Sequence, residues 1–195
     1  MTTHPRTLIL IRHANSHPQP GTPPHHWPLT AKGRQRAPLL APILRPYLPL
    51  RLFTSTEPKA HHTGQLLGQA LGLPATPIPN LHEHERATMP WFDTVAEFQA
   101  QVKNFYQHPD ELVLGEETAH TVQQRITTTI NTLWQDQAPH NLAIVSHGTA
   151  LTLYLAALTR QDPILLWLAS QTAGMPAYTI LHPNQPPTPT TWHPL

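Results

Sequence analysis

The hydrophobic positions of the chain form short continuous runs that alternate with stretches of helical spacing. Residues 7–11 and 141–146 each contain an unbroken aliphatic run, which predicts strands covered on both faces. Shorter hydrophobic runs predict further strands at 51–54, 75–78 and 177–181. Helical spacing predicts helices at 31–44, 58–71, 91–106, 117–134 and 148–158. Strands therefore alternate with helices along most of the chain.

Proline modifies this pattern in the first helix and at the end of the chain. Pro38 and Pro42 each remove an amide donor and crowd the preceding turn, so we expect a break within 31–44. Residues 14–28 are rich in Pro, His and Asn without any period, which predicts a loop. From about residue 183 the chain is rich in Pro and Thr, and we expect a polar tail there.

The alternation predicts an α/β fold, a three-layer sandwich with a central, mostly parallel sheet flanked by helices. A chain of 195 residues with 39% hydrophobic residues can close one core, so we expect a single domain over residues 1–195. Ligands of such sheets bind beyond the carboxyl ends of the strands. Arg12, His13 and His147 directly end or follow predicted strands, so they are expected at that edge.

The composition of the chain argues against several classes of partner and excludes several kinds of site. The chain has 12 Lys and Arg against 11 Asp and Glu, a formal charge of +1, which argues against a nucleic-acid partner. The absence of cysteine excludes disulfides, thiolate metal sites and a cysteine nucleophile. The first aliphatic run, Leu8 to Ile11, is too short for a signal-peptide core or a membrane span. We therefore expect a cytoplasmic protein with no membrane partner.

Several side chains at or near the predicted strand ends suit phosphoryl transfer: Arg12, His13, Lys59, Glu83, Glu85 and His147. A neutral imidazole can attack phosphorus in line, and a protonated carboxyl can give its proton to the departing alkoxide. An arginine offers a planar fork to two phosphoryl oxygens, and a lysine offers a point charge. Asn15, two residues after His13, is a further candidate phosphate contact. The backbone amide of Thr149, at a helix N-terminus, is another.

Six short motifs resemble, in the same order, those of the histidine phosphatase superfamily, which includes the cofactor-dependent phosphoglycerate mutases. The motifs are Arg12-His13, Leu29-Thr30 with Gly33, Ser55 to Thr63, Leu81-His82-Glu83, Gly115-Glu116, and Val145-Ser146-His147-Gly148. Each motif alone is weak evidence, but the ordered set is specific. The resemblance implies a phosphoglycerate mutase-like fold.

The resemblance also implies roles for individual residues. It implies that His13 becomes phosphorylated and that Glu83 is the proton donor. Arg12, Lys59 and His147 would then hold the phosphoryl oxygens. Neither a metal nor a cofactor is implied, and the expected partner is a small phosphorylated substrate.

Three positions depart from the family pattern. Ala14 stands in place of the usual glycine, so the backbone there must accept a Cβ. Lys59 replaces an arginine and loses its bidentate fork, so either phosphate binds more weakly or another donor shares the oxygen. Gln19 stands where the mutases often have an asparagine donor.

We therefore expect a metal-independent phosphatase that hydrolyses a small phosphate monoester through a phosphohistidine on His13. A phosphoglycerate mutase-type phosphoryl transferase is the first alternative, and Gln19 weighs against it. A non-catalytic phospholigand-binding sensor, motivated by the change to Lys59, is the second. For the proton donor, the place directly after the Leu-x element favours Glu83 over Glu85. The oligomeric state stays open.

Two other groups of residues have simpler interpretations. The doublets His25-His26 and His61-His62 and the cluster at 82–85 lack the spacing that gathers metal ligands on one face, so no metal site is expected. The aromatic residues of 91–106 are expected in the core, with a lid above the cleft as the alternative.

Overall fold

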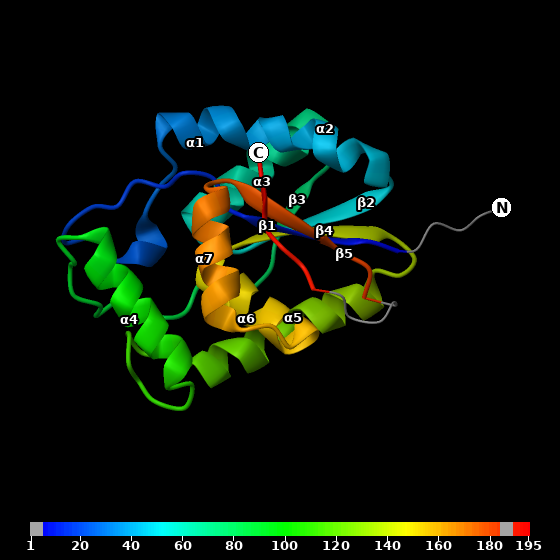
Figure 1. Cartoon of the computed structure of the whole chain (residues 1–195). Helices are drawn as coiled ribbons and strands as arrows, with labels where there is room; N and C mark the ends of the chain where they lie inside the picture. The colour runs from blue at the N-terminus through cyan, green and yellow to red at the C-terminus, as the bar shows by residue number, and fades with distance from the viewer. Residues whose placement is uncertain (1–5, 184–188) are drawn as a thin grey trace.

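The computed structural model describes residues 6–183 and 189–195, and a six-stranded sheet forms its centre (Figure 1). The strands are β1 (Leu8–Arg12), β2 (Leu50–Thr54), β3 (Ala75–Pro77), β4 (Asn141–Ser146), β5 (Ala177–Leu181) and β6 (His193–Pro194). They lie in the order β3-β2-β4-β1-β5-β6. The first four of these are parallel, and β5 is antiparallel to both of its neighbours. The predicted mostly parallel sheet is confirmed.

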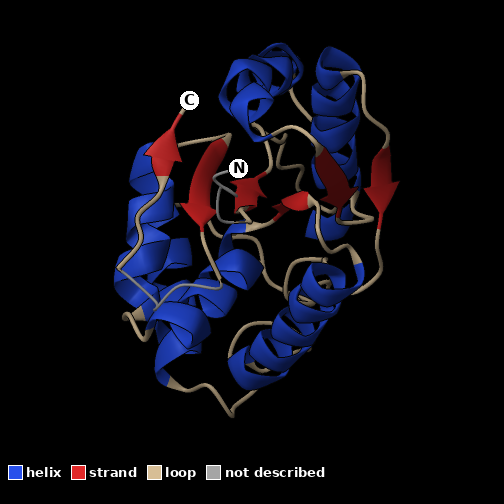
Figure 2. Ribbon diagram, turned by 90° about the vertical axis from the view of Figure 1, so that its right-hand side faces the viewer, coloured by secondary structure: helices blue, strands red, loops and turns tan. Residues whose placement is uncertain are grey.

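Helices cover both faces of the sheet, which gives the predicted three layers (Figure 2). One face carries α1 (Ala31–Arg36), α2 (Ala41–Leu44) and α3 (Pro58–Leu71), and the other carries α5 (Ala119–Asp136), α6 (Gly148–Thr159) and α7 (Pro163–Ala173). Helix α4 (Val95–Gln107) lies beyond the carboxyl ends of the parallel strands (Figure 1). Within the described part of the chain, none of the helices has the length and apolar character needed to cross a membrane.

The central strands are buried on both faces because their side chains alternate. In β1, Leu8 and Leu10 belong to the core cluster shared with α5 and α6, whereas Ile9 and Ile11 belong to the cluster shared with α2 and α3. The same alternation occurs in β4. Both strands are therefore fixed from above and below, and so are the residues that directly follow them.

The first helical segment is broken at its prolines, as the sequence predicts. Helix α1 is followed by a 3-10 turn at 37–40, then by α2 and a second 3-10 turn at 45–47. Pro38, Pro42 and Pro46 each lie in the first turn of a new segment, where no amide hydrogen bond is needed.

Two helices differ from the sequence-based prediction. Helix α4 begins at Val95 instead of 91, because Thr94 and Glu97 form a capping box that starts the helix there. Helix α7 was not predicted at all, because its sequence is apolar without a clear period. The sequence nevertheless contains a helix start signal, because the Asp162 side chain caps the helix and Pro163 occupies its first turn.

The end of the chain differs from the polar tail expected from about residue 183. Part of that segment, 184–188, lies outside the described residues. Beyond it, β6 pairs with β5, and Trp192 is only 4% exposed within the core cluster of α5 and α6. The segment is rich in Pro and Thr, which predicted a polar tail, but it also contains Trp192. Burial of this large apolar side chain holds the segment against the rest of the fold.

Candidate active site

The ends of β1 and β4 bring two histidines together. Arg12 and Ser146 are partners in the parallel β1–β4 register, so His13 and His147 leave neighbouring strands at the same level. Their ring centroids lie 5.2 Å apart with the planes inclined at 60°. Both residues are buried. The imidazoles that are distant in the sequence therefore share one site.

The ring of His13 is oriented by its own neighbour in the chain. Its Nδ1 lies 2.7 Å from the carbonyl oxygen of Ala14, so Nδ1–H donates and Nε2 keeps a lone pair. Burial, together with His147 and Lys59, lowers the pKa of His13 well below its ordinary value. The backbone accepts a Cβ at Ala14 because positive φ is not required there. His13 thus presents a neutral ring with a free nitrogen.

His147 is held from the side of β2. Its Nε2 lies 2.9 Å from Ser55 Oγ and 3.7 Å from a Glu57 carboxylate oxygen. Its Nδ1 is buried and has no hydrogen-bond partner among the described residues. Burial lowers the pKa of His147 to about 4, although Glu57 opposes this shift. At neutral pH this ring is therefore also uncharged, with one nitrogen unused.

Arg12 is fixed by helix α7. It donates from Nη1 to the Ser170 carbonyl oxygen at 2.8 Å and from Nη2 to Gln171 Oε1 at 3.1 Å. Its Nε has no partner among the described residues. Burial lowers the pKa of Arg12 to about 10, so the side chain stays charged at neutral pH. A Cβ on Gly148 would lie 3.2 Å from Arg12 Nε, so a glycine there allows α6 to approach the guanidinium closely.

Lys59 is buried and already paired. Its ammonium group forms an ion pair with Glu57 and donates to the Pro24 carbonyl oxygen at 2.8 Å. Burial acts to raise the pKa of Glu57, but His147 and Lys59 outweigh it and lower that pKa to about 2. Because an ammonium group has three protons, one donor of Lys59 remains for a ligand.

Glu83 lies at the N-terminus of α6. Its carboxylate accepts hydrogen bonds from the backbone amides of Thr149 at 3.1 Å, Ala150 at 2.9 Å and His84 at 3.1 Å. Burial acts to raise the pKa of Glu83, but the contact with His84 and the charge of Arg86 hold it well below its ordinary value. The Glu83 side chain is therefore an ionised carboxylate in the unliganded protein.

The other candidates occupy different surroundings. Glu85 has a side chain that is 61% exposed and lies 3.8 Å from His82, outside the cluster around Glu83. The Thr149 amide is occupied by Glu83 instead of being free for an anion. Asn15 does not line either of the two cavities described below.

Helix α5 braces the loop that carries Glu83. Arg125 donates to the carbonyl oxygens of Asn80, His82 and Glu83 at 2.9 to 3.2 Å and pairs with Glu117 at 2.7 Å. Further along the loop, the carboxylate of Glu116 accepts from two backbone amides, those of residues 87 and 88. Gly115 permits this arrangement because its φ is +95° and a Cβ would collide with the Glu85 carbonyl oxygen.

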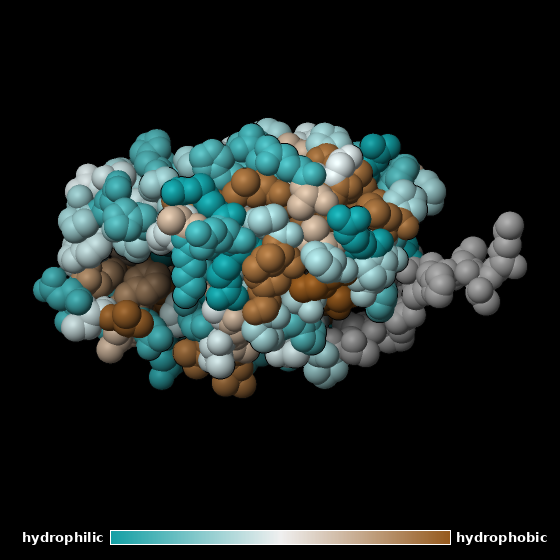
Figure 3. Space-filling model, turned by 90° about the horizontal axis from the view of Figure 1, so that it is seen from above, coloured by the Kyte–Doolittle hydropathy of each residue, from teal (hydrophilic) through white to brown (hydrophobic). Residues whose placement is uncertain are grey.

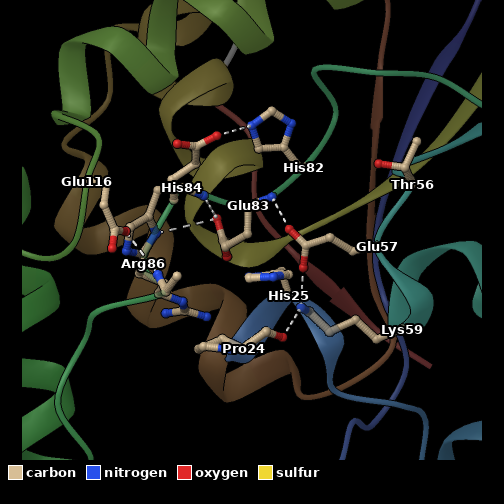
Figure 4. Close-up of a pocket in the computed structure, with 12 residues that line it drawn as sticks. Pro24, His25, Thr56, Glu57, Lys59, His82, Glu83, His84, Arg86 and Glu116 are labelled. Carbon is tan, nitrogen blue, oxygen red and sulfur yellow. Dashed lines mark hydrogen bonds and ion pairs between the residues drawn. The ribbon is translucent and has the colours of Figure 1, made fainter. Parts of the chain in front are cut away.

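Arg86 is a cation of the site that the sequence analysis did not include. Figure 4 shows Arg86 and Lys59 on either side of Glu83, with both cationic groups directed into the same space. The Nε and Nη1 atoms of Arg86 are buried and have no partner among the described residues. Unpartnered buried donors of this kind fit an anionic ligand, since leaving them unpaired is costly.

Two cavities meet at Lys59, Glu83 and Arg86. The first, of about 480 Å³, extends toward His25 and the loop at 82–87 (Figure 4). The second, of about 410 Å³, contains Arg12 and His13 and extends toward the loop at 89–95 and α4. The second cavity is therefore the one in which a ligand can reach the free nitrogen of His13.

The aromatic residues of 91–106 fall into two groups. Phe105 and Tyr106 are buried in the core. Trp91, Phe92 and Phe98 line the second cavity. Across residues 6–183 and 189–195, no group of three or more His, Asp or Glu side chains is arranged to hold a metal ion.

Several site residues had weak sequence signals. Ser55 and Glu57 lie inside one of the recognised motifs, but only the fold shows that both face His147. Gln171 lies on the unpredicted helix α7 and acts on Arg12 across more than 150 residues. Arg86 follows Glu83 by three positions, and that proximity was the one available indication.

Comparison with protein-family models and solved structures places this geometry in context. Residues 8–185 match the model of the histidine phosphatase superfamily (branch 1). A search of curated protein sequences found no match. Among solved structures, a mycobacterial glucosyl-3-phosphoglycerate phosphatase is 22% identical with a TM-score of 0.69, covering 91% of this chain and 90% of that chain.

Two other solved structures are similar in fold. The mycobacterial phosphatase complexed with VO3 is 21% identical with a TM-score of 0.70, covering 96% of both chains. A phosphoserine phosphatase from Entamoeba histolytica, in complex with 3-phosphoglyceric acid, is 18% identical with a TM-score of 0.71, covering 97% of both chains. These likenesses show a shared fold. With a family model that matches nearly the whole chain, the protein belongs to the histidine phosphatase superfamily (branch 1).

Proposed function

We propose that the protein is a phosphatase that hydrolyses small phosphate monoesters through a phosphohistidine on His13. The observation that carries this proposal is the state of the His13 ring. It is neutral and buried, and its Nδ1–H is held by Ala14, so the Nε2 lone pair is directed away from that bond. A group in this state is a competent nucleophile toward phosphorus.

The reaction proceeds in two displacements. His13 Nε2 attacks phosphorus, the bond from phosphorus to the ester oxygen breaks, and the leaving oxygen takes a proton from Glu83. Water then attacks the phosphohistidine, Glu83 accepts a proton from that water, and the N–P bond breaks to release inorganic phosphate. The two steps return the enzyme to its starting state, and no metal or cofactor enters either step.

The first step needs a proton that the free site does not hold, because the low pKa of Glu83 keeps it ionised. A bound phosphate dianion adds negative charge beside this carboxylate and favours its protonation. A bound monoanion would bring the same proton. The reactive complex therefore contains one more proton than the free enzyme and the dianion together.

Charge in the site supports binding of a phosphoryl group. The site contains three cations, Arg12, Lys59 and Arg86, and two carboxylates, those of Glu57 and Glu83. Because the histidines are neutral, its net charge is positive. We assign the phosphoryl oxygens to the free donors of Arg12 and Arg86, with the remaining proton of Lys59 and the Nδ1–H of His147 as further donors. Without Arg86 the site would have no net positive charge.

The main test is detection of the intermediate by rapid quench with a labelled phosphate monoester. We expect acid-labile, base-stable phosphate on the wild-type protein and on His62→Asn, a control on the exposed face of α3, but none on His13→Asn. Phosphate release should be unaffected by EDTA. Binding of the ester without label or release would indicate a sensor, and transfer to 3-phosphoglycerate faster than to water would indicate a mutase.

A further inference from the structure

The cavity beside His13 has a divided lining. Its inner end carries the charged residues of the site. Large apolar side chains contribute most of the remaining wall: Trp27, Met89, Trp91, Phe98, Trp167 and Met175. The space-filling view shows a hollow with brown, hydrophobic walls at the end of the molecule where α4 lies (Figure 3). A leaving group attached to the phosphoryl group must extend into this part.

The apolar walls are held in place by contacts of their own. The indole Nε1 of Trp27 donates to the Thr22 carbonyl oxygen at 2.9 Å. The ring of Phe98 lies 6.2 Å from that of Trp167, edge to face, and 5.4 Å from the guanidinium carbon of Arg86. The aromatic surface therefore continues directly from the cation that faces the phosphoryl position.

Two of the polar side chains on the same walls are already engaged. Thr94 Oγ accepts from the Glu97 amide in the helix cap, and Gln171 bonds to Arg12 and Ser170. Asp93 is exposed, and its carboxylate would repel a phosphorylated ligand. Besides the two engaged side chains, Ser16 and Asp93 are the polar side chains left on a mostly apolar wall, so a leaving group rich in hydroxyls would lose more hydrogen bonds to water here than it gains.

We infer that the leaving group is an apolar ring system, so the substrate class is the phosphate monoesters of arylalkyl or aryl alcohols. This inference rests on the proposed phosphatase function. The size of the cavity agrees with it, because an apolar cavity of about 150 Å³ holds one benzene ring. The 410 Å³ available accommodates a phosphoryl group together with one or two rings.

The first test compares two alkyl phosphates that differ in the polarity of the alcohol. Benzyl phosphate should have a kcat/KM at least thirtyfold higher than that of glycerol 3-phosphate. In parallel, benzylphosphonate, which is not hydrolysed, should bind at least thirtyfold more tightly than methylphosphonate in titration calorimetry. The calorimetry measures recognition of the ring without any chemical step.

A variant of the cavity wall tests whether this wall causes the preference for benzyl phosphate over glycerol 3-phosphate. Trp91→Ala removes an indole that is 52% exposed and does not belong to the buried core, so the fold should survive. We expect the benzyl-to-glycerol ratio to fall at least fivefold. Leu112→Ala removes another exposed apolar side chain, outside both cavities, and should leave the ratio and the turnover unchanged.

The outcomes separate this inference from the proposed function. If both esters are hydrolysed at similar rates and both phosphonates bind equally, the substrate inference is wrong and the phosphatase proposal stands. If neither ester is hydrolysed but benzylphosphonate binds preferentially, the phosphatase proposal fails and the apolar-ring site stands. An unchanged ratio in Trp91→Ala would contradict the location in this cavity.

Discussion

At the scale of single residues, burial decides what each group in the site can do. It keeps His13 and His147 neutral, so the positive charge comes from arginine and lysine side chains alone. One of these, Lys59, is balanced by Glu57, an acid that stands two residues before it. The lysine that stands where the family resemblance implies an arginine is thus held in a local ion pair. Arg86 offers the planar fork that the lysine lacks.

Substitution of Arg86 tests this division of roles. Arg86→Ala should weaken inhibition by vanadate and lower kcat/KM, each by roughly ten- to a hundredfold, because a charge-assisted hydrogen bond contributes about 1.5 to 3 kcal/mol. Arg86→Lys should be intermediate, since it keeps the charge and loses the fork. Arg51→Ala, an exposed arginine of β2 outside both site cavities, is the matched control and should behave as wild type. Unchanged vanadate inhibition in Arg86→Ala would exclude Arg86 from the site.

The protonation states also predict the pH dependence of kcat/KM. The lowered pKa of His13 places the acidic limb well below pH 6.5, because the ring stays unprotonated there. Above about pH 6 the monoester loses its second proton, and Glu83 is already ionised, so the required proton becomes scarce. Activity should therefore be highest on the acidic side of neutrality. A kcat/KM that keeps rising from pH 6 to 8 would contradict this proton count.

At the scale of elements, the site is made where four elements converge. Strands β1 and β4 supply the histidines, α6 receives the Glu83 carboxylate at its N-terminus, and α7 fixes Arg12 through its last turn. At the β4–α6 junction, Gly148 lets α6 lie close to the guanidinium of Arg12 without a Cβ between them.

Gly148→Ala tests the importance of that approach. The added Cβ would lie 3.2 Å from Arg12 Nε, so the guanidinium must shift by a few tenths of an ångström. Because the residue begins a helix with φ outside the positive region, the fold should be kept. We expect kcat/KM to fall about tenfold, since small misplacements of a binding group are costly in catalysis. A kcat/KM equal to wild type, with the melting temperature also unchanged, would contradict the tight contact.

At the scale of the whole molecule, the buried histidines of the site make the folded protein less stable at low pH. Burial lowers the pKa values of His13, His84 and His147 in the folded protein, so below about pH 6.5 the unfolded chain binds more protons. Stability must then fall as the pH falls. For His147 alone, a change from 6.5 to about 4 corresponds to about 3 kcal/mol, which is a large part of the 5 to 15 kcal/mol typical of a domain.

Urea denaturation at several pH values checks this linkage. The free energy of unfolding of the wild type should decrease steadily from pH 7 to pH 4. In His147→Gln the decrease over the same interval should be smaller by about 3 kcal/mol, because the variant lacks this titrating group. A wild-type free energy that is constant between pH 7 and 5 would show that the buried histidines do not control stability.

The sequence predicted the layered sheet and the placement of Arg12, His13 and His147 at one edge of it, because buried parallel strands have an unbroken apolar pattern. Glu83 entered the predicted site through the family resemblance. It did not predict α7, whose apolar sequence has no period, nor the return of the chain through Trp192. It also missed partners that only the fold brings together, such as Gln171 with Arg12. Local patterns encode elements, whereas contacts between distant elements depend on packing.

The most direct test of the central claim is a crystal structure of the protein with vanadate, which adopts the geometry of the phosphoryl transition state. We predict a trigonal bipyramidal vanadate bonded to His13 Nε2, with Arg12 and Arg86 within hydrogen-bond distance of its equatorial oxygens. Vanadate bound elsewhere, or bound at this edge without a bond to His13 Nε2, would contradict the phosphohistidine mechanism.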